Sequence, residues 1–536
     1  MYIIIYDFGT SCVKTCLFHI DSGIELLASS SASYGLYITA DGGAEQDTEE
    51  WWAALCSTTR DLFLKSDVLP KDIDGMAFCT QIQGTVLVDA NGNALRRPMT
   101  YLDQKGIKEY EECMGRGIIK VFGCSLYKLI KNLRVNYAAS TSAKDPVWKY
   151  KWVEKHEPEV FAKTDKWLDI NEYLAGRCTG RIIRTADTAF ATFLYDTRKG
   201  REGWNKGLVK MYKVKPEHLP EIIENTDLVG GLTRKAADDL GLVPGIPVFG
   251  GGGDTTFVSI GAGSAQPGRT HIYVGTSGWV STFMDHQACD IRSTITGVLS
   301  AKRGYFNYYA ELETAGKCFD WALKHLALDE VGIYLQKTKV TDDLESRYTS
   351  LYEYLCEEIS KVPPGANGVI FTPWMHGNRC PFGDANAAGI FFNIRVENGK
   401  KDMLRAVLEG ICYHLRWMLE CEDAKVTTSD PVRFVGGGSL SPVTCQMLAD
   451  ITGRTIETVD HAQEVGAIGT ALAVAAGIKG TDVLQLSEQL VKVKQTYLPN
   501  AENKEVYERN YRTFRKLYRS NAAAFKEMNG SSWGKA

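Results

Sequence analysis

Apolar and polar stretches alternate along the whole chain and predict a regular succession of strands and helices. Short apolar runs at residues 3–5, 75–80 and 432–435 are typical of buried strands. Residues 146–156 and 402–419 carry apolar and aromatic side chains at helical spacing, as does the segment 167–174. Strands that alternate with helices in this way predict an α/β fold.

One pattern occurs twice, about half a chain apart. The first apolar strand runs into Gly-Thr-Ser at residues 9–11, and a second apolar run follows. Residues 271–284 repeat this order, with Gly-Thr-Ser at 275–277 between two apolar runs. Both segments predict β-hairpins, and their recurrence indicates two similar halves.

The length of 536 residues exceeds what one ordinary core accommodates, so we expect two large domains. The segment 242–250 contains Pro and Gly and leads into a predicted strand, which makes it a plausible boundary. We therefore predict domains over residues 1–248 and 249–536.

Composition and charge exclude several classes of protein. The chain is 44% hydrophobic with a formal net charge of −4, unlike the basic surface of a nucleic-acid binder. Asp7 ends the first apolar run, which argues against a signal peptide, and no apolar stretch is long enough to span a membrane. We expect a cytoplasmic protein that binds neither nucleic acid nor membrane.

The cysteines and histidines form no metal-binding or disulfide pattern. The 14 Cys include no C-x-x-C pair, and the nine His include no H-x-x-x-H pair. In a chain of this length, scattered cysteines among apolar neighbours indicate reduced thiols in preference to a disulfide or zinc framework.

Three glycine-rich turns follow predicted strands, at residues 9–11, 275–278 and 436–439. Glycine lets backbone N–H groups approach a ligand closely, and successive N–H groups form concavities that bind anions. Two matching turns could hold a polyphosphate from both sides. The sequence contains neither G-x-x-x-x-G-K-[ST] nor a helix-opening G-x-G-x-x-G, so it has neither a P-loop nor a dinucleotide fingerprint.

Two charged residues flank the first turn. Asp7 could hold Mg²⁺ through water, because Mg²⁺ dehydrates reluctantly; the alternative is a carboxylate that stabilises the hairpin turn. Lys14 could bring positive charge toward a phosphate, or it could be a solvated strand residue.

Four glycines at residues 250–253 precede Asp254, the single carboxylate of that segment. A substrate could come close to such a backbone, and a carboxylate there is suited to accept the proton of an attacking hydroxyl. The alternative is an N-cap, because residues 254–256 before an apolar run are a good helix start, and one Asp can serve both purposes.

Together these motifs resemble the FGGY family of carbohydrate kinases, within the actin-like ATPase superfamily. The resemblance covers nearly the whole chain and preserves the motif order, with Asn378 in place of a glutamate of the family. It rests on residues 7–14, 146–156, 250–255, 273–278, 371–389 and 435–453.

The resemblance implies two actin-like (ribonuclease H-like) ATPase domains that flank a cleft for nucleotide and sugar. It implies ATP and Mg²⁺ as cofactors and transfer of the γ-phosphoryl group to a hydroxyl of a small sugar or polyol. Similar proteins are commonly homodimers, and the sequence itself indicates no interface.

The resemblance also assigns roles to individual residues. Asp254 would be the catalytic base and Asp7 the carboxylate associated with the metal. The residues expected at the nucleotide are Gly9, Thr10, Ser11, Lys14, Gly275, Thr276, Gly316, Asp320, Gly437 and Ser441. Those expected at the sugar are Gln81, Ile82, Gln83, Asp103, Asp254 and Thr255.

Within the family the chain is most similar to xylulokinases, which makes a ketopentose such as D-xylulose the first expectation. The departures fall on the sugar side: Ile82 and Gln83 replace a usual Met and His, and Thr255 replaces Asn. Tyr101 stands where Trp is common and Lys105 where Arg is common, whereas Asp103 is retained. Residues that bind particular hydroxyls discriminate strongly, so another ketose, a deoxy sugar or a polyol such as erythritol is the alternative.

Two other classes of function use the same motifs. An actin-like or chaperone-like nucleotide switch would need both hairpins but not Gln81, Gln83 and Asp103 in a sugar pocket. A catalytically silent sugar sensor would bind sugar without releasing ADP. The presence of Asp254 and of both phosphate turns argues against this alternative. Stimulation of ATP turnover by a sugar separates these alternatives from a kinase.

Overall fold

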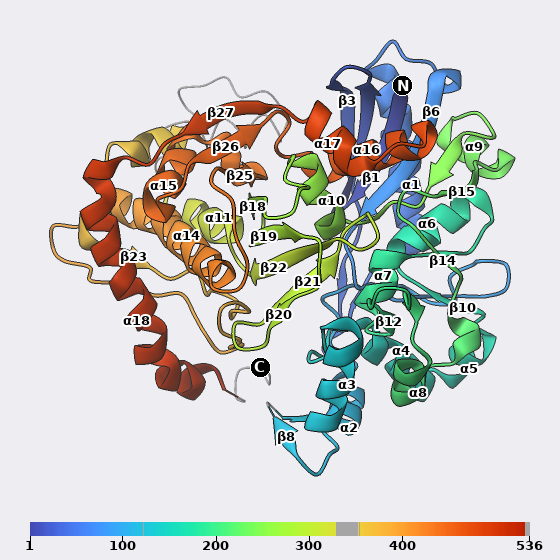
Figure 1. The fold of residues 1–536 in the computed structure, drawn as a ribbon, viewed down its shortest axis with the longest axis horizontal. Coiled ribbons are helices and arrows are strands. Elements are labelled where there is room, and N and C mark those ends of the chain that lie inside the picture. Colours follow the sequence, from blue (N-terminus) through green and yellow to red (C-terminus); the bar gives the residue numbers. More distant parts are fainter. Residues whose placement is uncertain (122, 328–351, 353, 531–536) are drawn as a thin grey trace.

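The computed structural model describes residues 1–121, 123–327, 352 and 354–530, which contain two large sheets (Figure 1). The first sheet has the order β15-β16-β6-β1-β2-β3, and β17 also pairs with β6. Its strands are β1 Tyr2–Phe8, β2 Cys12–Ile20, β3 Ile24–Ser33, β6 Ile73–Thr80, β15 Leu228–Gly231, β16 Pro247–Phe249 and β17 Gly252–Gly253.

The second sheet has the order β20-β21-β22-β19-β18-β25-β26-β27. Its strands are β18 Thr270–Val274, β19 Gly278–Met284, β20 Cys289–Asp290, β21 Ile295–Leu299, β22 Phe306–Leu312, β25 Val432–Val435, β26 Ile456–Val459 and β27 Val493–Tyr497.

The two sheets repeat one arrangement, as the recurring hairpins predict. In the first, β1 pairs antiparallel with β2 and parallel with β6. In the second, β18 pairs antiparallel with β19 and parallel with β25. The order β3-β2-β1-β6-β16 thus corresponds to β22-β19-β18-β25-β26. The two Gly-Thr-Ser turns therefore occupy equivalent places in the two halves.

Helices cover both faces of the first sheet. Alternate side chains of a strand point to opposite faces, and β1 carries apolar side chains on both of them. Ile4, Tyr6 and Phe8 of β1 pack in one cluster with Trp51 of α1 (Thr48–Leu64). On the other face, Ile3 and Ile5 pack with α16 (Val465–Lys479), which comes from near the end of the chain. Figure 1 shows the orange-red α16 lying against the blue strands of this sheet.

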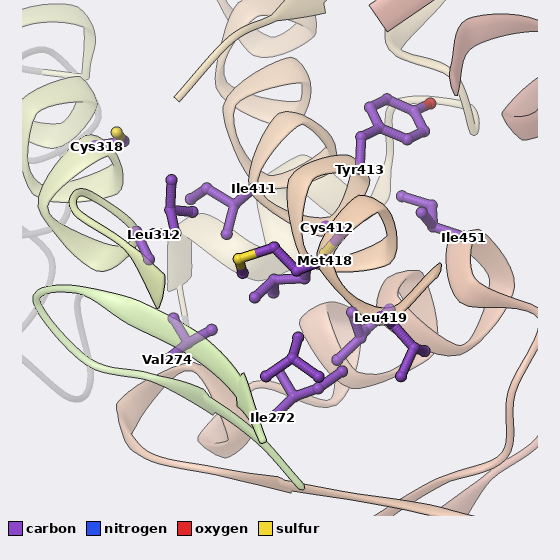
Figure 2. Packing of buried hydrophobic residues seen from close by; sticks show 14 of the residues in the cluster. Ile272, Val274, Leu312, Cys318, Ile411, Cys412, Tyr413, Met418, Leu419 and Ile451 are labelled. Carbon is purple, nitrogen blue, oxygen red and sulfur yellow. The ribbon is translucent and has the colours of Figure 1, made fainter. Parts of the chain in front are cut away.

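The core of the second sheet lies beneath α14 (Lys400–Asp423). Figure 2 shows Ile411 and Met418 of this helix close to Val274 of β18 and Leu312 of β22. The helices α11 (Gly316–Leu326) and α15 (Pro442–Thr452) pack against α14. This packing fixes the strand from which the second Gly-Thr-Ser turn emerges.

The segment 167–174 differs from the predicted helix. Its first residues lie in β10 (Lys166–Leu168), which pairs with β7 (Val86–Val88), and α6 (Ile170–Thr179) begins only after Asp169. The helix prediction is therefore wrong for residues 167–168, whose short apolar run fits either element. The Asp169 side chain caps α6 in a capping box with Glu172.

The fourteen cysteines all lie in the described part of the chain and form no disulfide there, in agreement with the reading of reduced thiols. Every helix in the described part of the chain is too short or too polar to cross a lipid bilayer.

Candidate active site

The first Gly-Thr-Ser turn joins β1 to β2. The Gly9 N–H donates to the Cys12 carbonyl oxygen at 3.0 Å, which closes the turn. The Thr10 hydroxyl lies 3.1 Å from the Tyr101 hydroxyl, and its carbonyl accepts from Gln46 Nε2 at 2.6 Å. Ser11 is exposed at the tip. Tyr101 and Gln46 thus hold the turn at Thr10, while Ser11 at its tip stays accessible to solvent.

The second turn carries the start of α11. The Gly316 N–H donates to the Gly275 carbonyl oxygen at 2.9 Å, and the Ala315 N–H donates to that of Thr276 at 3.1 Å. A Cβ atom on Gly316 would lie only 2.3 Å from the Gly275 oxygen, so this contact requires glycine. The structure therefore brings Gly275, Thr276 and Gly316 together, and their contact with one nucleotide stays a prediction.

The third glycine-rich turn lies against the second. Residues Gly437–Leu440 form a 3-10 helix after Gly436, whose φ is 84°. A Cβ atom on Gly438 would lie 2.8 Å from the side chain of Val274, the last residue of β18. Ser441 caps α15 and accepts from the Thr444 N–H at 3.2 Å. This places Gly437 and Ser441 on the same side of the protein as the second turn.

Asp320 lies one turn into α11, and its carboxylate accepts a hydrogen bond from the Tyr352 hydroxyl. Burial raises the pKa of Asp320, and Lys324 partly offsets the shift. The residue therefore belongs to the same helix as Gly316 but is already paired with a tyrosine.

Asp254 is the first residue of α10 (Asp254–Gly261), and Gly253 occupies the N-cap position. The glycine run also has a purpose within the protein, and the close approach of a substrate to it stays a prediction. A Cβ atom on Gly251 would lie 2.3 Å from the Phe78 oxygen, and one on Gly252 would lie 2.4 Å from Asn225 Nδ2. Both also have positive φ angles of 61° and 151°. These glycines let the chain itself pack closely behind Asp254.

Asp187, which the sequence analysis did not single out, holds this turn. Its buried carboxylate accepts hydrogen bonds at 2.8 Å from the Gly253 N–H and from the Thr256 hydroxyl. Asn225 Nδ2 donates to the same carboxylate at 2.7 Å. Asp187 thus binds the Gly253 backbone before Asp254 and the Thr256 side chain after it. No motif marks it, because its partners lie far away in the sequence.

The two acidic candidates influence each other. Burial raises the pKa of Asp7 to about 7, and the negative charge of Asp254 adds to this shift. Burial also raises the pKa of Asp254 to about 6, and the charge of Glu311 contributes in the same direction. The two carboxylates therefore lie close enough for the charge of Asp254 to disfavour ionisation of Asp7.

Lys14 and Thr255 are both engaged by neighbouring residues. Lys14 on β2 lies 3.3 Å from the carboxylate of Glu464, the residue before α16, and sequence reasoning missed this partner. The Thr255 N–H donates to Asp254 Oδ1 at 2.7 Å, and the Thr255 carbonyl accepts from Asn307 Nδ2 at 3.2 Å. Residues from both sheets thus converge around Asp254.

The predicted sugar residues Gln81, Ile82 and Gln83 follow the end of β6. Gln81 Nε2 donates to Gln46 Oε1 at 2.9 Å. The Ile82 side chain lies against Gly253, where an added Cβ atom would be 3.0 Å away. The three residues therefore lie beside the turn that presents Asp254.

Gln83 adopts an unusual backbone conformation, with a φ of 69°. Its N–H donates to Asp169 Oδ2 at 3.0 Å, and its carbonyl accepts from the buried Lys149 Nζ at 2.8 Å. Left-handed residues held in this way are common at ligand-binding sites, because the surroundings must stabilise the strain. The predicted family signature at residues 146–156 thus supplies Lys149 as a support for this loop.

Asp103 is fully buried, and both of its oxygens accept backbone hydrogen bonds. The Ala44 N–H donates to it at 2.9 Å and the Lys105 N–H at 3.0 Å. Burial raises the pKa of this carboxyl, and the adjacent N–H groups and Lys105 oppose that shift. Its contact with a sugar stays a prediction.

The arrangement suits transfer of an anionic group. Two exposed Gly-Thr-Ser tips can bind phosphate oxygens, and Asp254 offers a carboxylate beside them. In the described residues, no three His, Cys, Asp or Glu side chains gather into a metal-binding cluster. A single carboxylate at Asp7 is compatible with Mg²⁺, which keeps several waters and takes further ligands from phosphates.

Comparison with known proteins identifies the family. The model of the N-terminal domain of the FGGY family of carbohydrate kinases matches residues 2–261, and that of the C-terminal domain matches residues 270–478. The predicted domain boundary between residues 248 and 249 stays a prediction. The strand β17, which follows this boundary in the sequence, still pairs with β6 of the first sheet.

Full-length relatives and solved structures agree with this assignment. The chain is 28% identical over 520 residues to the xylulose kinase of Bacillus subtilis (strain 168), with 96% of each protein covered. Its fold matches a xylulose kinase and a gluconate kinase from Lactobacillus acidophilus, each with a TM-score of 0.81, 22% identity and coverage of 98% of this chain and 99% of the other. The chain therefore belongs to the FGGY family of carbohydrate kinases, ATP-dependent phosphotransferases that act on an alcohol group and have the actin-like ATPase fold.

Proposed function

We propose that this protein transfers the γ-phosphoryl group of ATP to a hydroxyl of a ketopentose, with D-xylulose as the first candidate. The observation that carries the proposal is Asp254, which begins α10 beside the first Gly-Thr-Ser turn and is fixed there by Asp187. Similarity to a full-length xylulose kinase supports the choice of sugar. Because Ile82, Gln83 and Thr255 depart from the xylulokinase pattern, another ketose or a polyol is the second candidate.

In the proposed reaction, Asp254 accepts the proton of the sugar hydroxyl as that oxygen attacks the γ-phosphorus. Gly9, Thr10, Ser11, Gly275 and Thr276 would hold phosphate oxygens through backbone N–H and hydroxyl groups. Lys14 would be shared between a phosphate and Glu464. Asp7 would hold Mg²⁺ through water, and the bound ion would neutralise charge on the β- and γ-phosphates.

The remaining predicted residues divide between the two ligands. Gly316, Gly437 and Ser441 would line the adenosine pocket, and Asp320 would contact the base in exchange for Tyr352. Gln81, Gln83 and Asp103 would face the sugar. We also propose that the protein works in the cytoplasm, because fourteen cysteines without a disulfide in the described part of the chain fit a reducing compartment and ATP is the phosphoryl donor.

The decisive experiment is an ADP-release assay with Mg·ATP across ketopentoses, other ketoses, aldoses, deoxy sugars and polyols. One strongly stimulating sugar, with a phosphorylated product of the expected mass, is the predicted result. ATP hydrolysis that no sugar stimulates would contradict the proposal and favour a nucleotide switch. A response to a polyol alone would keep the kinase and replace D-xylulose.

The pKa of Asp254 predicts how activity depends on pH. A general base must be unprotonated, and burial places this pKa near 6. We expect kcat/KM for the sugar, at saturating Mg·ATP, to fall about tenfold per pH unit below pH 6 and to level off above it. A rate that stays constant down to pH 4.5 would show that Asp254 is ionised throughout or is not the base.

A further inference from the structure

The strand β22 forms a wall opposite the residues already described. Asn307 of this strand donates to the carbonyl of Thr255, the neighbour of Asp254, at 3.2 Å. Alternate residues of a strand lie on one face, so Tyr309 and Glu311 share the face of Asn307. The charge of Glu311 also contributes to the raised pKa of Asp254, after the larger effect of burial. Glu311 therefore points into the space in front of the proposed base.

Arg379 joins Glu311 and Glu313 into a group of three charges, which we call the charged triad. Its Nη1 donates to the Glu311 carboxylate, and its Nε lies 3.5 Å from Glu313 Oε1. The Cys380 N–H donates to the Glu311 carbonyl at 3.2 Å, which ties the arginine loop to β22. The side chains are 43%, 22% and 25% exposed for Arg379, Glu311 and Glu313, so a ligand can reach all three.

The first domain faces the charged triad across the same space. Tyr101 is held there by its hydroxyl contact with Thr10 in the first Gly-Thr-Ser turn. Burial raises the pKa of Tyr101, and the charges of Asp254, Glu311 and Glu313 raise it further. The charges of the proposed base and of the triad thus both affect the pKa of Tyr101. Tyr101, which contacts the first Gly-Thr-Ser turn, therefore lies within electrostatic range of the triad and of the proposed base.

Resting on the kinase function proposed above, we propose that the charged triad lines the acceptor pocket and restricts it to uncharged sugars and polyols. Two carboxylates against one guanidinium leave a net negative charge, and Asp254 adds another. Arg379 is already paired through Nη1 and Nε, so its charge is compensated before any ligand arrives. Carboxylate oxygens accept and guanidinium N–H groups donate, which suits neighbouring hydroxyls of a neutral chain.

A sugar acid meets the opposite situation. Its carboxylate would lie near Glu311, Glu313 and Asp254, and like charges at close range cost several kcal/mol. Rejection by uncompensated like charge is a common source of specificity. The triad therefore places this chain with kinases of neutral acceptors.

The test compares neutral compounds with the acids that differ from them at one carbon: xylitol with D-xylonate, and D-glucitol with D-gluconate, alongside D-xylulose. For the wild type, we expect kcat/KM of the best neutral acceptor to exceed that of every acid by about 100-fold or more. In the double variant Glu311→Gln, Glu313→Gln, this ratio should shrink by about tenfold or more, because Arg379 becomes uncompensated and favours a carboxylate. A ratio is unaffected by a change in the fraction of folded enzyme.

The control is Glu505→Gln, which removes an exposed carboxylate on α18 (Lys504–Asn529) and should keep the wild-type ratio. Equal use of an acid and the best neutral acceptor by the wild type would overturn the proposal. So would an unchanged ratio in the double variant.

Calorimetric binding of the same compounds, with a non-hydrolysable ATP analogue present, separates this proposal from the kinase function. Binding of a neutral compound without turnover, together with exclusion of its acid, would contradict the kinase function and leave the triad's role intact. Absence of both binding and turnover would overturn both.

Discussion

Replacing Asp254 with asparagine is expected to lower kcat for the best sugar by roughly 10²–10⁴-fold, the range that a positioned general base contributes. The amide keeps the size and the hydrogen-bond acceptor of the side chain but cannot take the hydroxyl proton. The backbone around it stays fixed by Asp187, so the site should keep its shape. We expect the Kd for ATP to change by less than about threefold, because the predicted nucleotide contacts come from other residues.

Steady-state kinetics and nucleotide titration of the same preparation check this result. Asp285→Asn is the matched control, because it makes the same change on an exposed residue beyond the end of β19. Wild-type kcat in Asp254→Asn would refute the assignment of the base. Loss of ATP binding with loss of activity would point instead to a role for Asp254 at the nucleotide.

Substituting Gly469 with valine is expected to destabilise the protein by about 3 kcal/mol, at the upper end of the cost of overpacking a core. Gly469 lies where α16 crosses α10, and a Cβ atom there would be 2.1 Å from the Phe257 carbonyl oxygen. From the other side, a Cβ atom on Gly261 would be 1.8 Å from the Val465 oxygen. Backbone atoms cannot turn aside, so any side chain must force the two helices apart.

Urea unfolding followed by circular dichroism measures the free energy of unfolding of this variant. As a control, the same substitution by alanine is compared at two helical glycines, Gly469 and Gly176. Gly176 also lies in a helix, α6. The nearest atom to a Cβ added there is the Arg181 carbonyl oxygen, at 3.4 Å. Alanine should stabilise the protein there by up to about 1 kcal/mol and destabilise it at Gly469. Equal effects at the two positions would show that α10 and α16 separate without cost.

The sequence predicts those parts of the site whose residues are neighbours along the chain. Each Gly-Thr-Ser turn lies between two apolar strands, so local pattern and turn chemistry suffice to place it. Asp254 is conspicuous because it follows four glycines. The purpose of those glycines was not predictable, because Phe78 and Asn225 approach Gly251 and Gly252 from distant segments.

The missed residues act through contacts between distant segments. Asp187 reaches Gly253 across 66 positions, and Lys14 meets Glu464 across 450. Glu311 alternates with apolar residues on β22 and Glu313 follows the last residue of that strand, which is also the pattern of an ordinary solvent-facing edge. Only the pairing with Arg379 and the proximity of Asp254 distinguish them. Where a functional group is formed by residues from distant segments, the sequence of each segment alone does not reveal it.

The position of α16 has a consequence for how the protein is made. The face of the first sheet that carries Ile3 and Ile5 is covered by this helix, which ends at Lys479. A ribosome that adds about 5–20 residues per second needs roughly 20–80 s to travel from the end of β6 to that point. During this interval the apolar face of the newly made sheet lacks α16, the helix that covers it in the folded protein. Nascent chains therefore need a chaperone or slow collapse of this half, and a truncated protein that ends before α16 should aggregate in cells.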